Sequence, residues 1–124
     1  GAVSLADLAE LAHVRGTFGD YAVTHVDELL AEANIRPKQS IAVRGFLPIP
    51  IMLQGTEMIG FVPERIARDY APTLGLVIAK TPLTASPLVE VAYWHPSKST
   101  DPALSWLIDT LRMAAKSLRT MDKL

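Results

Sequence analysis

The residues of this sequence that could do chemistry are few and widely separated. Its three histidines, His13, His25 and His95, lack the spacing at which one helix presents two ligands to a metal ion. His95, which comes just before Pro96, is better explained as a loop histidine with satisfied hydrogen bonds. The sequence has no cysteine, which excludes thiolate metal sites, cysteine nucleophiles and disulfides together. We therefore expect no metal site.

Acid–base catalysis has equally little support. Glu57, Glu64 and Asp69 are carboxylates, but their positions do not predict an apolar pocket with two opposed acids, and solvated helix ends explain them. The sequence has no G-x-S-x-G nucleophile elbow, no phosphate-binding glycine loop and no G-x-G-x-x-G fingerprint. We therefore predict that the chain is not an enzyme and uses no cofactor.

The stretch best suited to binding a molecule runs from Ile41 to Pro63. An apolar, β-branched run at 41–44 is followed by a short helix led by Pro48, and then by a second apolar run at 58–62. This order predicts a parallel βαβ unit covered by helices. In such sheets ligands bind beyond the carboxyl ends of the strands, where the amino end of a helix attracts anions. We therefore expect a binding site in the residues that follow each strand.

Apolar residues at helical spacing predict further helices on both sides of this stretch. These helices are expected over residues 3–11, from Asp20 or Thr24 to Ala33, over 63–71 and over 101–118. Ser4 and Asp101 are the predicted caps of the first and last helices, and Pro102 takes the first position of the last one. Asn34 suits a left-handed cap after the second helix, and Pro72 should end the third.

Three more segments have the composition of strands. Residues 13–15 and 74–79 should join the two apolar runs above in one mainly parallel sheet. Residues 88–94 alternate apolar and polar side chains around Glu90, which predicts a strand covered on one face. The segment 80–87 is rich in Pro, Ser and Thr, as in a crossover. The fold class is therefore α/β with a Rossmann-like arrangement.

Composition limits the partners of the chain. With 124 residues, 49% hydrophobic residues and a formal net charge of -1, it is expected to be one globular domain. Its Lys and Arg residues are scattered, so we expect no nucleic-acid contact. No apolar run approaches the roughly 20 residues that span a bilayer, and no signal peptide is visible, so we expect no membrane contact. The absence of cysteine fits a cytoplasmic location.

Taken in order, these segments resemble the effector-binding domain of LysR-type transcriptional regulators, most of all the subgroup of nodulation regulators. One matching segment is Trp94-His95 followed by Asp101–Leu107 (DPALSWL). Another is Gly60–Ala67 (GFVPERIA). The resemblance extends over nearly all of residues 3–118.

The resemblance implies two Rossmann-like lobes, similar to those of periplasmic binding proteins, with a small molecule between them. Residues 3–80 would form the second lobe, 81–87 the hinge crossover, and 88–118 a strand and long helix that return to a first lobe whose other strands are not encoded here. The helix-turn-helix that binds DNA would also lie outside this sequence. This fragment would therefore make no direct contact with nucleic acid.

The same resemblance implies a site at the strand ends of the second lobe. The residues expected to contact the effector are Thr17, Phe18, Phe46, Leu47, Pro48, Ile49 and Val62. Ordinary turn and core packing is the alternative explanation of these positions. The effector would be a small aromatic or organic acid whose binding shifts the orientation of lobes and subunits.

Two further expectations concern partners and class. The apolar surface of residues 88–118 should join two or more copies into a homo-oligomer, because a single strand cannot cover it. The alternative function for the same fold is one lobe of a solute-binding protein for a transporter.

Overall fold

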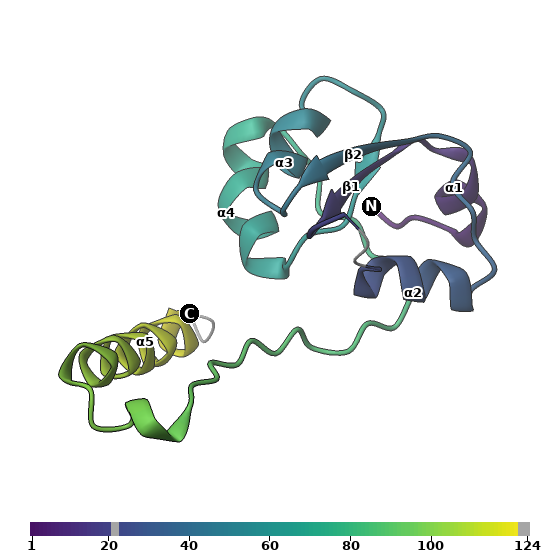
Figure 1. Cartoon of the computed structure of the whole chain (residues 1–124). Helices are drawn as coiled ribbons and strands as arrows, with labels where there is room; N and C mark the ends of the chain where they lie inside the picture. The colour runs from purple at the N-terminus through teal and green to yellow at the C-terminus, as the bar shows by residue number, and fades with distance from the viewer. Residues whose placement is uncertain (21–22, 122–124) are drawn as a thin grey trace. The chain divides into compact units, whose positions relative to one another are not determined.

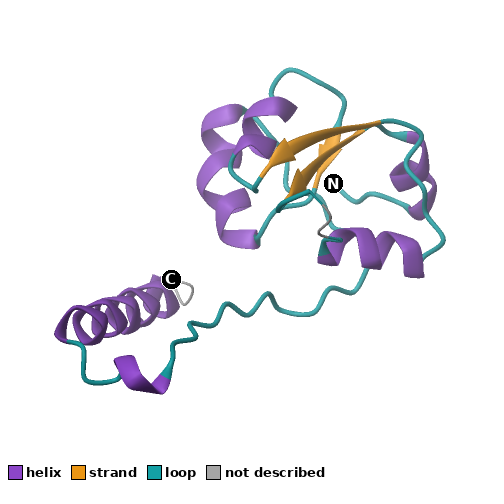
Figure 2. Ribbon diagram, viewed as in Figure 1, coloured by secondary structure: helices purple, strands orange, loops and turns teal. Residues whose placement is uncertain are grey.

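Three parallel strands form the centre of the fold (Figures 1 and 2). They are β1 (His13–Thr17), β2 (Ser40–Arg44) and β3 (Ile59–Gly60), and they lie in the order β2-β1-β3. Thr17 pairs with Arg44, and Val14 pairs with Gly60. The structure, a computed structural model, describes residues 1–20 and 23–121. The prediction that the runs at 13–15, 41–44 and 58–62 form a parallel sheet is confirmed, although β1 is longer and β3 shorter than expected.

Alternating side chains of β1 lie toward opposite faces of the sheet, and helices cover each face. On one face, α1 (Leu5–Glu10) and α2 (His25–Glu32) bury Leu8, Leu30 and Ile35 in one cluster, with Ile59 and Phe61 packed against it. The other face is covered by α3 (Pro48–Leu53), whose buried Ile49 lies against Gly16 and Gly60. The next helix, α4 (Glu64–Leu74), contacts α3.

Local hydrogen bonds start and end these helices as expected. Ser4 accepts the N–H of Asp7, and Asp7 accepts the N–H of Ser4 in return, which forms a capping box at α1. Thr24 and Asp27 form the same arrangement at α2, so that helix starts at His25 rather than near Asp20. Asn34 follows α2 with a φ of 55°, as predicted for a left-handed cap.

The predicted strand at 74–79 is wrong, and so is the prediction that Pro72 ends its helix. Pro72 lies inside the last turn of α4, which continues to Leu74. Gly75, with a φ of 65°, ends the helix instead, because its N–H and that of Leu76 both donate to the carbonyl oxygen of Ala71. Residues 76–79 then have no strand partner, and the one nearby bridge joins Lys80 to Ala2.

Residues Gly1–Leu88 and Val89–Leu124 form two separate units by their contacts. In the second unit, the predicted strand at 88–94 is absent among the described residues, because its backbone has no partner to pair with. A short 3-10 turn, η1 (Pro96–Lys98), leads to α5 (Pro102–Met121). Asp101 Oδ1 accepts the N–H groups of Ala103 and Leu104 at 2.9 and 3.3 Å, which confirms the predicted cap.

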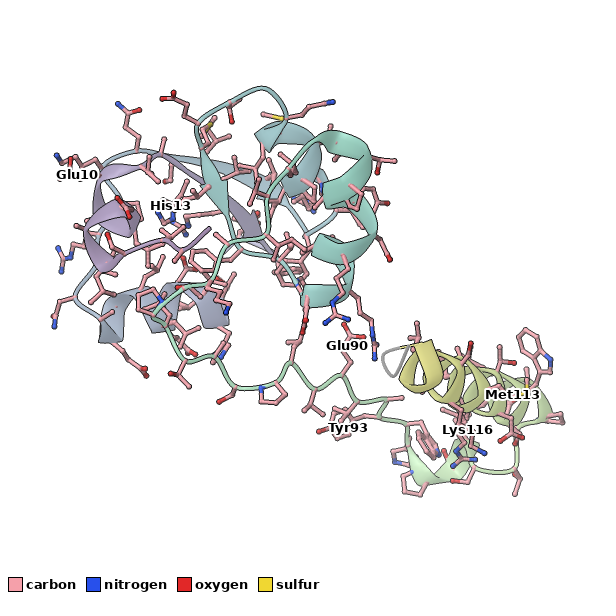
Figure 3. All side chains as sticks on the ribbon, turned by 180° about the vertical axis from the view of Figure 1, so that it is seen from behind. Glu10, His13, Glu90, Tyr93, Met113 and Lys116 are labelled. Carbon is pink, nitrogen blue, oxygen red and sulfur yellow. The ribbon has the colours of Figure 1, made fainter. Side chains whose placement is uncertain are left out.

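The second unit leaves many large apolar side chains exposed. Tyr93 is 89% exposed and Trp106 69% exposed, and Figure 3 shows Tyr93 beside the extended segment before η1. Leu107 and Leu111, which belong to the predicted apolar stripe of α5, are about half exposed. A soluble chain seldom leaves so much apolar area in water. The unit therefore lacks a cover for this face among the described residues.

Candidate functional site

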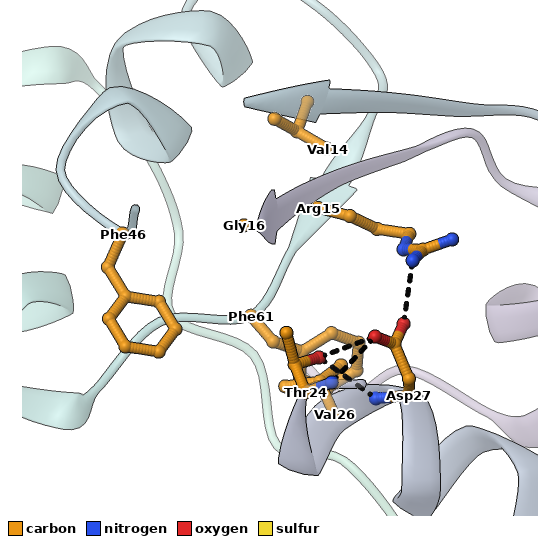
Figure 4. Close-up of a pocket in the computed structure, with 8 residues that line it drawn as sticks. All are labelled: Val14, Arg15, Gly16, Thr24, Val26, Asp27, Phe46 and Phe61. Carbon is orange, nitrogen blue, oxygen red and sulfur yellow. Dashed lines mark hydrogen bonds and ion pairs between the residues drawn. The ribbon is translucent and has the colours of Figure 1, made fainter. Parts of the chain in front are cut away.

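The carboxyl ends of β1 and β3 meet a small pocket at the edge of the sheet. Strand β1 lies between β2 and β3. The chain runs from β1 through α2 to β2 on one side, and then through α3 to β3 on the other side. In open parallel sheets ligands bind in the crevice beyond the strand ends at such a reversal. The residues that line this crevice, called here the strand-end pocket, are Val14, Arg15, Gly16, Thr24, Val26, Asp27, Phe46 and Phe61 (Figure 4).

Most walls of the strand-end pocket are apolar, and its polar groups are already ordered. Arg15, on β1, forms an ion pair with Asp27 on α2, with 3.0 Å between Nη2 and Oδ1. The other oxygen of Asp27 accepts from the backbone N–H of Thr24 at 2.9 Å and from its hydroxyl at 2.8 Å. Figure 4 shows these groups together on one wall. The cavity has a volume of about 10 Å³, which is enough for no more than one water molecule.

Two of the predicted site residues form an aromatic pair. The rings of Phe18, after β1, and Phe46, after β2, have centroids 4.7 Å apart and are tilted by 59°. Phe18 is 46% exposed, and Phe46 is half-buried. Phe46 also lines the strand-end pocket. The structure therefore brings these two predicted residues together at the carboxyl edge of the sheet.

The remaining predicted residues are divided between surface and core. Thr17, at the end of β1, donates its hydroxyl to the carbonyl oxygen of Val43 at 3.1 Å, which leaves its oxygen able to accept another hydrogen bond. Leu47 is exposed, while Pro48 and Val62 are half-buried. None of these lies among the residues of the strand-end pocket.

Ile49, another predicted site residue, is fully buried. Its side chain points into the sheet, where its Cδ1 and Cγ2 atoms fill the spaces over Gly16 and Gly60. A fully covered side chain cannot touch an effector in this conformation. Ile49 therefore holds α3 on the sheet and is a core residue.

The amino end of α3 is also less suited to an anion than its position suggested. Pro48 and Pro50 have no N–H, and the N–H of Ile49 donates to the carbonyl oxygen of Phe46 at 3.1 Å. Anion sites at helix ends need free N–H groups. With its six residues, α3 has none to offer from its first three positions, so the expectation of an anion there is wrong.

Sequence reasoning missed the polar wall of the pocket. Thr24 and Asp27 have the T-x-x-D spacing of a capping box, which was a readable signal for the start of α2. Arg15 gave no such signal, because its pairing with Asp27 joins a strand to a helix across the fold. Phe61 was read only as part of a strand, yet it lies just after β3 and lines the pocket.

His13 is a buried histidine that the sequence did not single out. It is 1% exposed, and its Nε2 lies 2.8 Å from the carbonyl oxygen of Leu8, so Nε2 carries the proton and donates it. Its Nδ1 is buried without a partner among the described residues, and its ring lies 6.2 Å from that of Phe61. Desolvation by burial lowers the pKa of His13, and the positive charge of Arg15 lowers it further. His13 is therefore neutral at pH 7 and fixes α1 to β1, inside the first unit (Figure 3).

Within the described residues, no cluster of His, Asp and Glu side chains could hold a metal ion. None of the described helices has the length and apolar character needed to span a membrane.

Comparison with known proteins places these features in a family. Residues 1–116 match the family described as LysR substrate binding domain. The chain is 36% identical to nodulation protein D 2 of Rhizobium tropici over 106 residues, which are 85% of this chain and 34% of that protein. It is 30% identical to nodulation protein D of Rhizobium leguminosarum bv. trifolii over 124 residues, which are 99% of this chain and 39% of that protein. The chain thus spans little more than a third of the length of these relatives. The family match does not favour the alternative function, one lobe of a solute-binding protein for a transporter.

Proposed function

Because this chain belongs to the LysR substrate-binding domain family, we propose that it senses a small organic effector for a transcriptional regulator. The single observation that carries the proposal is the reversal of strand order in a parallel sheet, with the Phe18–Phe46 pair at its carboxyl edge. The relatives carry the name nodulation protein D, and the regulatory role comes to this chain through the shared family.

The effector is proposed to lie at the carboxyl edge of the sheet, between this lobe and a facing surface. Its proposed contacts in this lobe are the aromatic pair Phe18 and Phe46, together with Thr17, Leu47, Pro48 and Val62, while the buried Ile49 would contribute by holding α3 in place. The exposure of Phe18 supports this assignment, because aromatic rings supply much of a ligand's apolar contact.

Residues 3–80 are proposed to act as one lobe, with 81–87 as the crossover and 88–118 returning to the other lobe. Hydrogen bonds support the boundary near residue 80. The N–H of Val3 donates to the carbonyl oxygen of Lys80 at 2.8 Å, and the N–H of Lys80 donates to the carbonyl oxygen of Gly1 at 3.1 Å. The two ends of this lobe therefore lie side by side. This is the arrangement expected where two chain segments connect one lobe to another.

We propose a cytoplasmic regulator without catalytic activity or cofactor that works as an oligomer. Residues 88–118 are the proposed contact between copies or with the other lobe, because their exposed apolar side chains need a cover. Effector binding would shift the population of orientations that an attached DNA-binding domain reads.

The proposal is tested with Phe46→Ala in the longer regulator that contains this chain. Loss of the ring should weaken the response of a reporter gene to effector while operator binding without effector stays unchanged. Ile51→Ala, which removes an exposed apolar side chain on α3, is the matched control. A normal dose–response in a folded Phe46→Ala protein would show that the ring is only structural.

A further inference from the structure

Strand β2 leaves one edge of the sheet open. It comes last in the order β2-β1-β3, so its residues from Ser40 to Arg44 pair with β1 on one side only. Four of its five residues are exposed. An open edge presents backbone N–H and C=O groups to another strand, and proteins usually block such an edge with proline, lysine or a covering segment. β2 contains neither proline nor lysine, and the described residues place no further strand beside it.

The segment 88–94 has the composition of a strand but no strand beside it. Its sequence, LVEVAYW, is rich in β-branched and aromatic residues and contains no proline or lysine. Residues 81–95 nevertheless form no helix or strand (Figure 2), and Val89, Val91 and Tyr93 are all more than half exposed. An extended segment becomes a strand when the open edge of a sheet completes its backbone hydrogen bonds. The chain therefore carries both an open edge and a segment suited to fill one.

The side chains of β2 divide between the two faces of the sheet. Val43 pairs with Gly16, which lies against α3, so Val43 and Ile41 belong to the face that α3 covers. Ala42 and Arg44 belong to the opposite face. Because Ile41 is 43% exposed, the apolar surface of the α3 face continues to the open edge.

The side chains of segment 88–94 divide in a matching way. In an extended conformation its apolar residues 89, 91 and 93 point to one side, and Glu90 and Ala92 point to the other. Beside β2, the apolar side would continue the face of Ile41 and Val43, and Glu90 would lie on the face of Arg44. Arg44 and Glu90 are both exposed and form no ion pair within the described residues. Opposite charges on neighbouring strands stabilise their pairing.

Pro87 decides the direction of this pairing. In a parallel arrangement with Glu90 opposite Arg44, Pro87 would lie opposite Ile41, where its missing N–H would interrupt the hydrogen bonds. In the antiparallel arrangement Pro87 lies beyond the end of β2. The antiparallel register pairs Glu90 with Arg44, Val91 with Val43, Ala92 with Ala42, Tyr93 with Ile41, and Trp94 with Ser40.

We propose that residues 88–94 of one copy pair antiparallel with β2 of a second copy, in the register that places Glu90 opposite Arg44. The inference rests on the proposed association through residues 88–118, and it names the surface that part of this segment meets. The pairing supplies hydrogen bonds to both open backbones and covers Ile41 with Tyr93. Each copy carries both the segment and the edge, so both copies of a dimer have the same means of pairing.

The first test is disulfide formation, since the chain has no cysteine of its own. In the proposed register Ala42 and Ala92 of two copies lie opposite each other, with Cα atoms about 4.5–5.5 Å apart, which suits a disulfide. Mixed Ala42→Cys and Ala92→Cys chains should form the mixed dimer under mild oxidation. The rate should be about tenfold higher than for Ala92→Cys mixed with Glu57→Cys, because pairing raises the effective concentration of the two thiols. Glu57 is an exposed residue in the loop before β3 and serves as the control site.

The second test reverses the two charges. Glu90→Arg and Arg44→Glu each place like charges opposite each other, so each should weaken association about fivefold in sedimentation equilibrium. The variant with both changes should associate as the wild type does, a rescue that cannot follow from loss of structure. Glu57→Arg and Arg36→Glu make the same charge changes at exposed sites outside the strands and should leave association unchanged.

The outcomes separate the inference from the proposed association. The inference is overturned, and association through residues 88–118 stands, if the wild type associates but the mixed dimer forms no faster than the control or the double charge reversal gives no rescue. A disulfide between two Ala92→Cys chains that forms faster than the mixed one also overturns it. A wild-type chain that stays monomeric at micromolar concentration overturns both the inference and the proposed association.

Discussion

Ile49 lies so close over Gly60 that a Cβ at position 60 would be 2.5 Å from Ile49 Cγ2 and 3.1 Å from the carbonyl oxygen of Val14. Real carbon atoms do not approach that closely, so α3 packs on β1 and β3 because position 60 has no side chain. Gly60→Ala should therefore lower the free energy of unfolding by about 1–3 kcal/mol, as overpacking does. Urea unfolding followed by far-UV circular dichroism measures it.

Gly55 supplies the control for that experiment. It has a φ of 71° and no atom near the position of a Cβ, so Gly55→Asn tests the turn without a clash. Its unfolding free energy should fall by less than that of Gly60→Ala, because only the left-handed backbone, which Asn tolerates, adds strain. If Gly60→Ala is as stable as Gly55→Asn, the contact with Ile49 is looser than the structure shows.

His13 should make the fold sensitive to acid. Burial lowers the pKa of His13 in the folded state, so the unfolded chain, with a histidine pKa of about 6.5, binds the proton more readily. The contribution of neutral His13 to the free energy of unfolding is therefore fully present above about pH 6.5, and it is lost as the pH drops through and below that value. Urea unfolding between pH 5 and 7.5 should show this loss in the wild type. In His13→Gln, which keeps an N–H donor but cannot titrate, the loss should be smaller.

The exposed His95 gives the comparison for this pH series. His95→Gln removes a histidine whose Nδ1 contacts Ser97 within its own loop. The pH dependence of its stability should match that of the wild type. If the unfolding free energy of His13→Gln changed with pH as it does in the wild type and in His95→Gln, the assignment of acid sensitivity to His13 would be contradicted.

Thr17 lies at the carboxyl end of β1 and bonds to the neighbouring strand. Its hydroxyl donates to the carbonyl oxygen of Val43, and Thr17→Val removes that donor at a cost of about 1 kcal/mol of stability. In the longer regulator we expect Thr17→Val to weaken the effector response more than operator binding. Thr17→Ser keeps the hydroxyl and should respond normally in the same reporter assay. Equal responses of both variants would mean that the hydroxyl serves only the sheet.

The second unit should cause association of the 124-residue chain. Leu107 and Leu111 are 45% and 49% exposed on α5, and each forgoes up to about 1.5–3 kcal/mol of burial in water. Sedimentation velocity at micromolar concentration should show dimers or larger species. Leu107→Glu with Leu111→Glu should shift the distribution to monomer, while Leu5→Glu, at a similarly exposed site on α1, should not. A monomeric wild type would refute association through this unit.

Local sequence was enough to predict the features that depend on near neighbours. Ser4, Asn34 and Asp101 end or start helices through hydrogen bonds and backbone angles within a few residues, and all three were predicted. The parallel βαβ order was also predictable, because two short apolar runs around a proline-led helix leave few other arrangements. The family resemblance rested on the same ordered segments, and the match over residues 1–116 confirms it.

Features that need a distant partner could not be read from the sequence. Residues 74–79 and 88–94 have the composition of strands, but a strand forms only where another backbone completes its hydrogen bonds, and the described residues supply none. The Arg15–Asp27 pair and the burial of His13 arise where β1 meets α2 and α1, because folding brings these elements together across many residues. Ile49 shows the same effect, since its apolar side chain suited either a pocket or the core, and the space over Gly16 and Gly60 placed it in the core.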